Sequence, residues 1–224
     1  MEILRAENLS KVYHGRQEVQ ALDQVSLSVE KGSLLAIMGD SGSGKSTFLH
    51  ILGGVDHPTG GRVFIQGTDI TELSESQMSV FRRRNIGIIY QFFNLIPNIN
   101  VRKNICLPLL LDRRKPEQDY YEDIIQTLGI TDKQQRFPNE LSGGEQQRVA
   151  IARSLISRPA VILADEPTGN LDRRNTQEIV SLFQLVNKSL KATIILVTHD
   201  EKVALSCEQV YTMADGRLYE GDRR

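Results

Sequence analysis

The sequence has few cysteines and no long apolar run, and both absences restrict where the chain can work. Cys106 and Cys207 lie far apart without metal-ligand spacing, so we expect reduced thiols in a cytosolic protein. No window approaches the ~20 apolar residues of a membrane span. The longest near miss, residues 105–111, contains Pro108. The first residues lack the apolar core of a secretion signal. We therefore expect any membrane anchor to come from a partner.

Excess positive charge is absent as well. The 224 residues include 27 Lys and Arg against 28 Asp and Glu, a net charge of −1. This balance argues against a protein held on nucleic acid by bulk charge. Two short basic runs, residues 82–84 and 113–115, lack interleaved aromatic residues, so we interpret them as solvated faces. A position near anionic head groups would also suit them. We expect no nucleic-acid partner.

Residues 39–47 organise the interpretation of the rest of the chain. They read Gly-Asp-Ser-Gly-Ser-Gly-Lys-Ser-Thr and fit G-x-x-x-x-G-K-[ST], the phosphate-binding loop. An apolar run of strand length precedes the motif and a helical pattern follows it, as the motif requires. Lys45 is expected to reach the β- and γ-phosphates, and the Ser46 hydroxyl to bind Mg²⁺. An ordinary Gly/Ser turn would not require these two residues there. The residues expected to hold ATP here are Gly39, Ser41, Gly42, Ser43, Gly44, Lys45, Ser46 and Thr47.

The apolar patterns along the chain predict an α/β fold. Residues 3–30 alternate between apolar and polar, with a turn at residues 15–16, so antiparallel β-structure is expected. Fully apolar runs alternate with helical patterns on both sides of a helical stretch, which is typical of a mostly parallel sheet covered on both faces. We predict a single domain over residues 1–224. It comprises a P-loop NTPase core (1–96 and 160–224) with an N-terminal antiparallel β subdomain, and a helical subdomain inserted at about 97–159.

Two carboxylates follow the apolar run at residues 161–164. Asp165 and Glu166 stand where this strand is expected to end, and the turn there would let both side chains face a nucleotide. Hydrolysis requires one acid for Mg²⁺ and one group that orients or deprotonates water. We assign Asp165 to the metal and Glu166 to the water. The alternative is a pair of surface acids in a turn.

Two further polar residues end apolar strands. His199 follows the run at 193–197 and is expected to contact the γ-phosphate, whereas a lone histidine is more often structural or exposed. Gln91 follows the run at 86–90, and its amide is expected to reach Mg²⁺ or the attacking water. The other three histidines lack this context and receive no role. The expected catalytic residues are Lys45, Gln91, Glu166 and His199, and the expected metal ligands are Ser46, Gln91 and Asp165.

Residues 141–148, Leu-Ser-Gly-Gly-Glu-Gln-Gln-Arg, place a second Gly-rich turn before a helix. A second anion-binding helix start is redundant within one nucleotide site, unless it closes over a nucleotide held by another copy. With this stretch the chain resembles the ATP-binding subunits of ABC transporters. Matching elements stand in the family's order: Tyr13, residues 39–47, Gln91, residues 141–147, Asp165 and Glu166, residues 169–172, and His199.

The resemblance implies an ATPase in which two copies sandwich two ATP molecules, with Mg²⁺, head to tail. Tyr13 would stack on adenine, and Asp172 would belong to the loop that links the two sites. Ser142 and Gly144 would contact the γ-phosphate across the interface, with Gly143 between them in the nucleotide site.

Within this family, residues 91–97 and 169–172 are similar to the group that serves lipoprotein release, macrolide efflux and resistance to antimicrobial peptides. The resemblance implies a separate integral-membrane permease and a cytoplasmic, peripheral position on the inner face of the cell membrane. The motor would export or extract lipoprotein, peptide or antimicrobial from the membrane. The apolar run at 92–97 is expected either to pack within the helical subdomain or to line a groove for a cytoplasmic helix of the permease.

Two other functions stay open. An ABC-type ATPase of DNA repair or translation would carry long coiled coils, zinc inserts or a second ATPase domain, and this sequence has none. A transmembrane signalling or cell-wall-regulating ATPase that moves no substrate is barely separated from a transporter by sequence.

Overall fold

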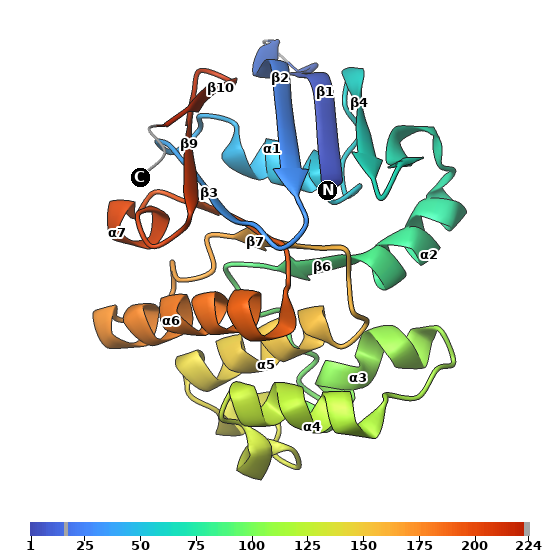
Figure 1. Ribbon diagram of the computed structural model, residues 1–224, viewed down its shortest axis with the longest axis vertical. Coiled ribbons are helices and arrows are strands. Elements are labelled where there is room, and N and C mark those ends of the chain that lie inside the picture. Colours follow the sequence, from blue (N-terminus) through green and yellow to red (C-terminus); the bar gives the residue numbers. More distant parts are fainter. Residues whose placement is uncertain (16–17, 222–224) are drawn as a thin grey trace.

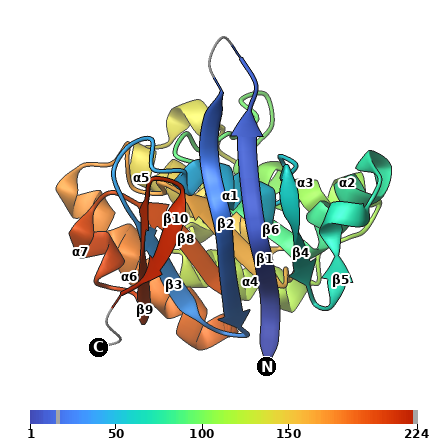
Figure 2. The same cartoon turned by 90° about the horizontal axis from the view of Figure 1, so that it is seen from above.

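Two β-sheets form the frame of the computed structural model, which describes residues 1–15 and 18–221 (Figure 1). The first sheet has the strand order β2-β1-β4-β5 and is antiparallel throughout. Figure 2 shows its two long strands, β1 (Glu2–Tyr13) and β2 (Val19–Glu30), side by side across the molecule. Strands β4 (Gly60–Ile65) and β5 (Thr68–Asp69) complete it. The antiparallel structure predicted for residues 3–30 is confirmed, whereas the turn predicted at residues 15–16 lies partly outside the described residues.

The second sheet has the strand order β10-β9-β3-β8-β7-β6. It is parallel except for the edge strand β10, which pairs with β9 in antiparallel orientation. Its central strands are apolar along their length and buried on both faces, as expected for strands covered by helices. A tight hairpin at Asp215 and Gly216, both with positive φ, turns the edge strand back. The strands are β3 (Leu34–Met38), β6 (Ile86–Ile89), β7 (Val161–Asp165), β8 (Ile194–Thr198), β9 (Gln209–Ala214) and β10 (Arg217–Glu220).

Different layers cover the two faces of this second sheet. One face packs on α1 (Lys45–Leu52) and the antiparallel sheet, through side chains such as Leu35 and Phe48. The opposite face packs on the helices below it in Figure 1, through side chains such as Leu196 and Val149. Those helices are α3 (Val101–Leu111), α4 (Gln118–Thr127), α5 (Gly143–Leu155) and α6 (Arg173–Leu190). The predicted α/β fold with an inserted helical region is therefore confirmed, whereas the bounds at about 97–159 stay a prediction.

The fold has further helices outside these two groups. Helix α2 (Glu75–Asn85) begins at Ser74, whose hydroxyl and the Gln77 amide cap each other's backbone as a capping box. The remaining short helices are α7 (Glu201–Ala204) and the 3₁₀ turns Ile70–Glu72, Thr131–Lys133 and Pro138–Glu140. Within the described part of the chain, we find no helix with the length and hydropathy needed to cross a bilayer.

Candidate active site

The phosphate-binding loop connects β3 to α1, and its glycines meet two different demands. Gly42 and Gly44 have φ angles of 82° and 106°, in the left-handed region that favours glycine. A Cβ on Gly44 would lie 2.4 Å from the carbonyl oxygen of Ala21 on β2, whereas a Cβ on Gly42 would meet nothing within 4 Å. The loop is therefore tightly packed at its base and open at the turn.

The donor groups of this loop fit a polyphosphate. Gly44 starts α1 without a side-chain cap, so no side chain of the cap residue occupies the first amides of the helix. The Ser43 hydroxyl is buried and has no hydrogen-bond partner among the described residues. The Lys45 ammonium donates to the carbonyl oxygens of Gly39 and Asp40, at 2.8 and 2.7 Å. These donors converge on one loop and together would match the oxygens of a phosphate chain.

The two side chains predicted to bind Mg²⁺ meet beside this loop. The Ser46 hydroxyl donates to Asp165 Oδ1 at 2.8 Å, across 119 positions of the chain. His50 Nε2 lies 3.5 Å from the other oxygen of Asp165. Mg²⁺ prefers oxygen ligands and usually takes one or two from protein and the rest from substrate phosphates and water. The pair fits such a site, and among residues 1–15 and 18–221 no cluster of three or more His, Cys, Asp or Glu forms a separate metal cage.

Glu166 and His199 are also brought together, from the ends of two neighbouring strands. His199 Nδ1 lies 3.0 Å from Glu166 Oε2. Glu166 has a φ of 45°, which is uncommon outside glycine and costs conformational energy, and its amide donates to Val197. This turn sends successive carboxylates in different directions, since Asp165 contacts α1 while Glu166 contacts the end of β8.

Gln91 follows β6 and contacts the loop after β7 rather than Asp165 or Glu166. Its amide nitrogen donates to Asn170 Oδ1 at 3.4 Å, and the Asn170 amide donates to the Gln91 carbonyl at 2.9 Å. A Cβ on Gly169 would lie 2.8 Å from the Gln91 amide nitrogen, so a side chain there would displace it. Gln91 thus links the helical region to the loop that follows the carboxylates.

Ser142 and Asp172 each cap a helix, and the two helix starts lie next to each other. The Ser142 hydroxyl accepts from the Glu145 amide, and the Glu145 carboxylate accepts from the Ser142 amide at 2.8 Å. The hydrogen bond from the Ser142 amide is the largest cause of a lowering of the pKa of Glu145. Asp172 accepts from the Asn175 amide, and a Cβ on Gly144 would lie 2.5 Å from Asn175 Oδ1. The starts of α5 and α6, residues 142–145 and 172–175, therefore form one surface.

This surface is separate from the phosphate-binding loop. Helix α5, which starts at Ser142, packs on the face of the parallel sheet opposite to α1. In the part of the chain that the structure describes, no hydrogen bond or ion pair joins Ser142 to residues 39–47. The two anion-binding helix starts thus do not form one site within this chain.

Tyr13 lies at the end of β1, where its ring is partly exposed and its hydroxyl is hydrogen-bonded. The hydroxyl donates to Asp56 at 2.7 Å and lies 3.5 Å from the Thr47 hydroxyl at the end of the phosphate-binding loop. Lys11 also donates to Asp56, and its ammonium lies 4.8 Å from the centre of the Tyr13 ring. Although burial acts in the opposite direction, the hydrogen bonds from Lys11 and Tyr13 leave the pKa of Asp56 below its ordinary value.

Four residues join the site to which the sequence assigned no individual role: His50, Asp56, Asn170 and Asn175. None of them ends an apolar strand, which was the signal that found Gln91 and His199. Asn170 and Asp172 stand in one short loop, but their different partners became visible only in the fold.

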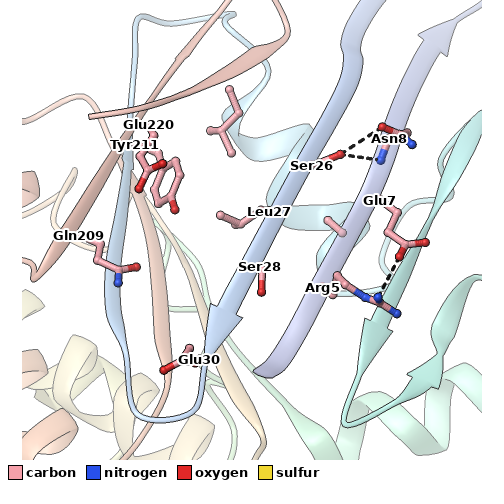
Figure 3. A pocket seen from close by; sticks show the side chains of 12 residues that line it. Arg5, Glu7, Asn8, Ser26, Leu27, Ser28, Glu30, Gln209, Tyr211 and Glu220 are labelled. Atoms are coloured by element: carbon pink, nitrogen blue, oxygen red, sulfur yellow. Dashed lines mark hydrogen bonds and ion pairs between the residues drawn. The ribbon is translucent and has the colours of Figure 1, made fainter. Parts of the chain in front are cut away.

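A large cleft lies away from these residues. It has a volume of about 1140 Å³ and separates β1 and β2 from β9 and β10 (Figure 3). An ion pair of 3.1 Å between Arg5 and Glu7 and hydrogen bonds between Asn8 and Ser26 occupy its wall. None of the sequence-predicted site residues lines it.

A smaller cleft of about 270 Å³ lies between α2, β6, α3 and α5. Its lining is mostly apolar with an arginine rim and includes Arg82, Arg83, Ile88, Leu107, Pro108, Leu111 and Arg153. Residues 92–97, which we predicted either to pack in the helical subdomain or to line a groove, are divided between two environments. Leu95 packs on the core, whereas Phe92 is 69% exposed outside this cleft. Arg153 lines the cleft and donates to the carbonyls of Phe93 and Asn94, so it connects residues 92–97 to the cleft.

Comparison with known proteins supports one family. The model of the ABC transporter family matches residues 22–169. The lipoprotein-releasing system ATP-binding protein LolD of Bordetella avium is 45% identical over 221 residues, which are 97% of this chain and 96% of that protein. The LolD protein of Aquifex aeolicus is 43% identical over 97% of this chain and 96% of its own length. The solved dimer of the ATP-binding cassette MJ0796, in a post-hydrolysis state with ADP and inorganic phosphate, is 36% identical with a TM-score of 0.87. The aligned region covers 99% of this chain and 98% of the MJ0796 chain.

Proposed function

The chain belongs to the ABC transporter family, a family of ATPases, and we propose that it drives a membrane complex that releases lipoproteins from the bilayer. It is the ATP-hydrolysing subunit of an ABC transporter. The observation that carries the hydrolytic part is the convergence of Ser46, Asp165, Glu166 and His199 at the ends of α1, β7 and β8. The lipoprotein part rests on the names of relatives that match this chain over nearly its whole length.

In the proposed reaction, residues 39–47 bind the phosphates and Lys45 exchanges its two carbonyl partners for phosphate oxygens. Ser46 and Asp165 would hold Mg²⁺, with Gln91 proposed as a further ligand, and the ion supplies positive charge to the phosphate oxygens when bound. Glu166 accepts a proton from the attacking water or orients it, and His199 fixes the direction of that carboxylate. We propose that His199 also contacts the γ-phosphate.

The proposed site needs a second copy of this chain. Ser142, Gly143 and Gly144 begin α5 on the side of the sheet opposite to α1, with Ser142 exposed, and a helix N-terminus favours an anion. A head-to-tail pair would bring them against the phosphates that Lys45 of the other copy binds. Asp172 and Asn175, next to Gly144, would then connect the two nucleotide sites. Tyr13 would stack on the adenine ring, with Asp56 holding its hydroxyl.

The proposed membrane partner is a permease that seats a cytoplasmic segment in the 270 Å³ cleft. The cleft has apolar walls from Leu107 and Pro108, which would take apolar side chains of such a segment. Arg153 couples it to the segment after Gln91, and Gln91 contacts the loop behind Glu166. This chain of contacts would let ATP closure move the permease. We propose accordingly that the subunit lies on the cytoplasmic face of the membrane.

Reconstitution tests this function. The chain is purified from membranes together with the membrane protein that co-purifies, and the complex is placed in liposomes that carry a fluorescent acylated protein. We expect release of the acylated protein on addition of ATP and Mg²⁺, and none with the Glu166→Gln complex. ATP hydrolysis that is stimulated by the membrane partner without any release, also from liposomes carrying an acylated peptide or a macrolide, would instead support the signalling alternative.

A further inference from the structure

Exposed leucines meet exposed cations at the C-terminal end of α3. We call this surface, residues 110–115, the α3 tip. Leu110 and Leu111 are 50% and 60% exposed, and Arg113, Arg114 and Lys115 are exposed immediately after them. In Figure 1 this segment is the turn that connects α3 to α4, at the edge of the molecule below α2. Two neighbouring large apolar side chains left in water beside three cations are uncommon on a surface that serves only solvation.

The α3 tip is held in a fixed shape. The backbone amides of Asp112, Arg113 and Arg114 donate to the carbonyls of Leu109 and Leu110, which closes the end of the helix. The Asp112 side chain is only 4% exposed and accepts from Arg83 and Arg84 on α2, at 2.8 and 2.5 Å. The exposure of the leucines therefore belongs to the packed structure, because α2 clamps the turn that presents them.

Positive charge is concentrated here although the whole chain has a net charge of −1. The tip and the adjacent residues 82–84 contain six arginine and lysine residues, and two of them, Arg83 and Arg84, pair with Asp112. The side chains of Arg113, Arg114 and Lys115 have no hydrogen bond or ion pair with any described residue. The next acid along the chain, Glu117, is itself paired with Arg158 at 2.9 Å.

We propose that the α3 tip binds the surface of an anionic phospholipid bilayer. Leu110 and Leu111 would enter the head-group region, and the three cations would lie against lipid phosphates. A nucleic acid is the weaker fit, because the tip offers aliphatic rather than aromatic side chains for contact. Leu111 and Arg83 also line the cleft proposed for the permease, so a partner seated there would bring the tip to the membrane.

Binding of the purified full-length chain to liposomes tests the proposal. One set of liposomes contains only phosphatidylcholine, and the other contains equal parts of phosphatidylcholine and phosphatidylglycerol. We expect co-sedimentation with the second set only, weakening as salt is raised. The triple variant Arg113→Ala, Arg114→Ala, Lys115→Ala should bind roughly a hundredfold more weakly, since each basic residue near such a surface contributes about a factor of five. Leu110→Gln should also reduce binding.

The matched control is the triple variant Lys31→Ala, Lys188→Ala, Lys191→Ala, which removes the same charge from an exposed region elsewhere. It should bind like the unmodified chain. Both triple variants should hydrolyse ATP normally in solution, which shows that they are folded. The proposal would be overturned if both triple variants lost liposome binding equally, or if the unmodified chain did not bind anionic liposomes. Binding only to an added oligonucleotide would overturn it as well. The position of the α3 tip at a membrane rests on the proposed function, but this binding test needs no permease. Its failure would therefore leave the proposed function standing.

Discussion

The imidazole of His199 lies 3.0 Å from the carboxylate of Glu166, and this contact joins the ends of two parallel strands that are adjacent in the sheet. Glu166 reaches it through a backbone turn with a φ of 45°. A turn that costs conformational energy persists where the surrounding structure enforces it, which is common at active sites. The contact also sets Glu166 apart from Asp165, because the latter is bonded to Ser46 on α1.

Glu166→Gln is expected to keep ATP binding and to lower turnover by about 10²-fold or more, roughly the effect of a lost general base. Loss of the carboxylate should also trap an ATP-bound dimer, since closure no longer leads to hydrolysis. Turnover is measured by phosphate release and the dimer by size-exclusion chromatography with ATP. Glu208→Gln, at an exposed position outside the site, is the control. Turnover within a few-fold of the unmodified chain would refute the role of Glu166.

His199→Ala should lower the maximal rate while leaving the affinity for ATP almost unchanged. The reason is that His199 contacts Glu166, whereas the phosphates are held mainly by residues 39–47. If His199 acts only through Glu166, then His199→Ala should add little to Glu166→Gln. His14→Ala, whose imidazole pairs with Glu18 at the surface, should behave like the unmodified chain. Full additivity of the two substitutions would show that His199 acts separately.

Asp165→Asn should raise the Mg²⁺ concentration needed for hydrolysis, because an amide is a weaker ligand than a carboxylate for a hard cation. Ser46→Ala should also raise the required Mg²⁺ concentration, since Ser46 Oγ lies only 2.8 Å from Asp165 Oδ1. The measurement is a Mg²⁺ titration of ATP hydrolysis, with removal of the metal by a chelator as the baseline. An unchanged Mg²⁺ requirement in both variants would contradict the assignment.

Most of the parallel sheet and one half of the site could be predicted from the sequence because both follow local rules. The buried strands are apolar throughout, and the residues that end them reach the same edge of the sheet. This is why Gln91, Asp165 and His199 were found. The phosphate-binding loop was found because its glycines and its Lys45 stand at fixed spacing between a strand and a helix.

The remaining features depend on contacts between distant segments. Helix α3 was not predicted individually because Pro108 interrupts its pattern, and in the fold the buried Asn104 side chain bonds to the backbone of Ile96 and Ile99 and holds its start. His50 was dismissed as lacking context, since only the packing of α1 against β7 brings it to Asp165. The docking surface was predicted in the apolar run at 92–97, whereas the walls of the cleft that we propose for it come from four separate elements.

Leu107→Asp should abolish co-purification with the permease and leave ATP binding by the isolated subunit intact. Leu107 is half-buried in the wall of the 270 Å³ cleft, so a carboxylate there would be desolvated by any apolar segment that docks. Phe93→Asp is expected to act in the same way through the segment that Arg153 holds. Leu185→Asp, on an exposed part of α6, is the control. Retained co-purification in the Leu107 variant would place the docking surface elsewhere.

Mixing two inactive chains tests the central claim, a nucleotide site shared between two copies, most directly. Ser142→Arg chains should bind ATP through their own Lys45 but fail to close on a partner, whereas Lys45→Ala chains should lack the phosphate contact. In a mixed dimer one site collects both defects and the other has none. We therefore predict that ATP hydrolysis, absent from each variant alone, returns in part on mixing, and that the chain with both substitutions stays inactive. No recovery, or a specific rate that is unchanged when the unmodified chain is diluted to monomers, would contradict the account.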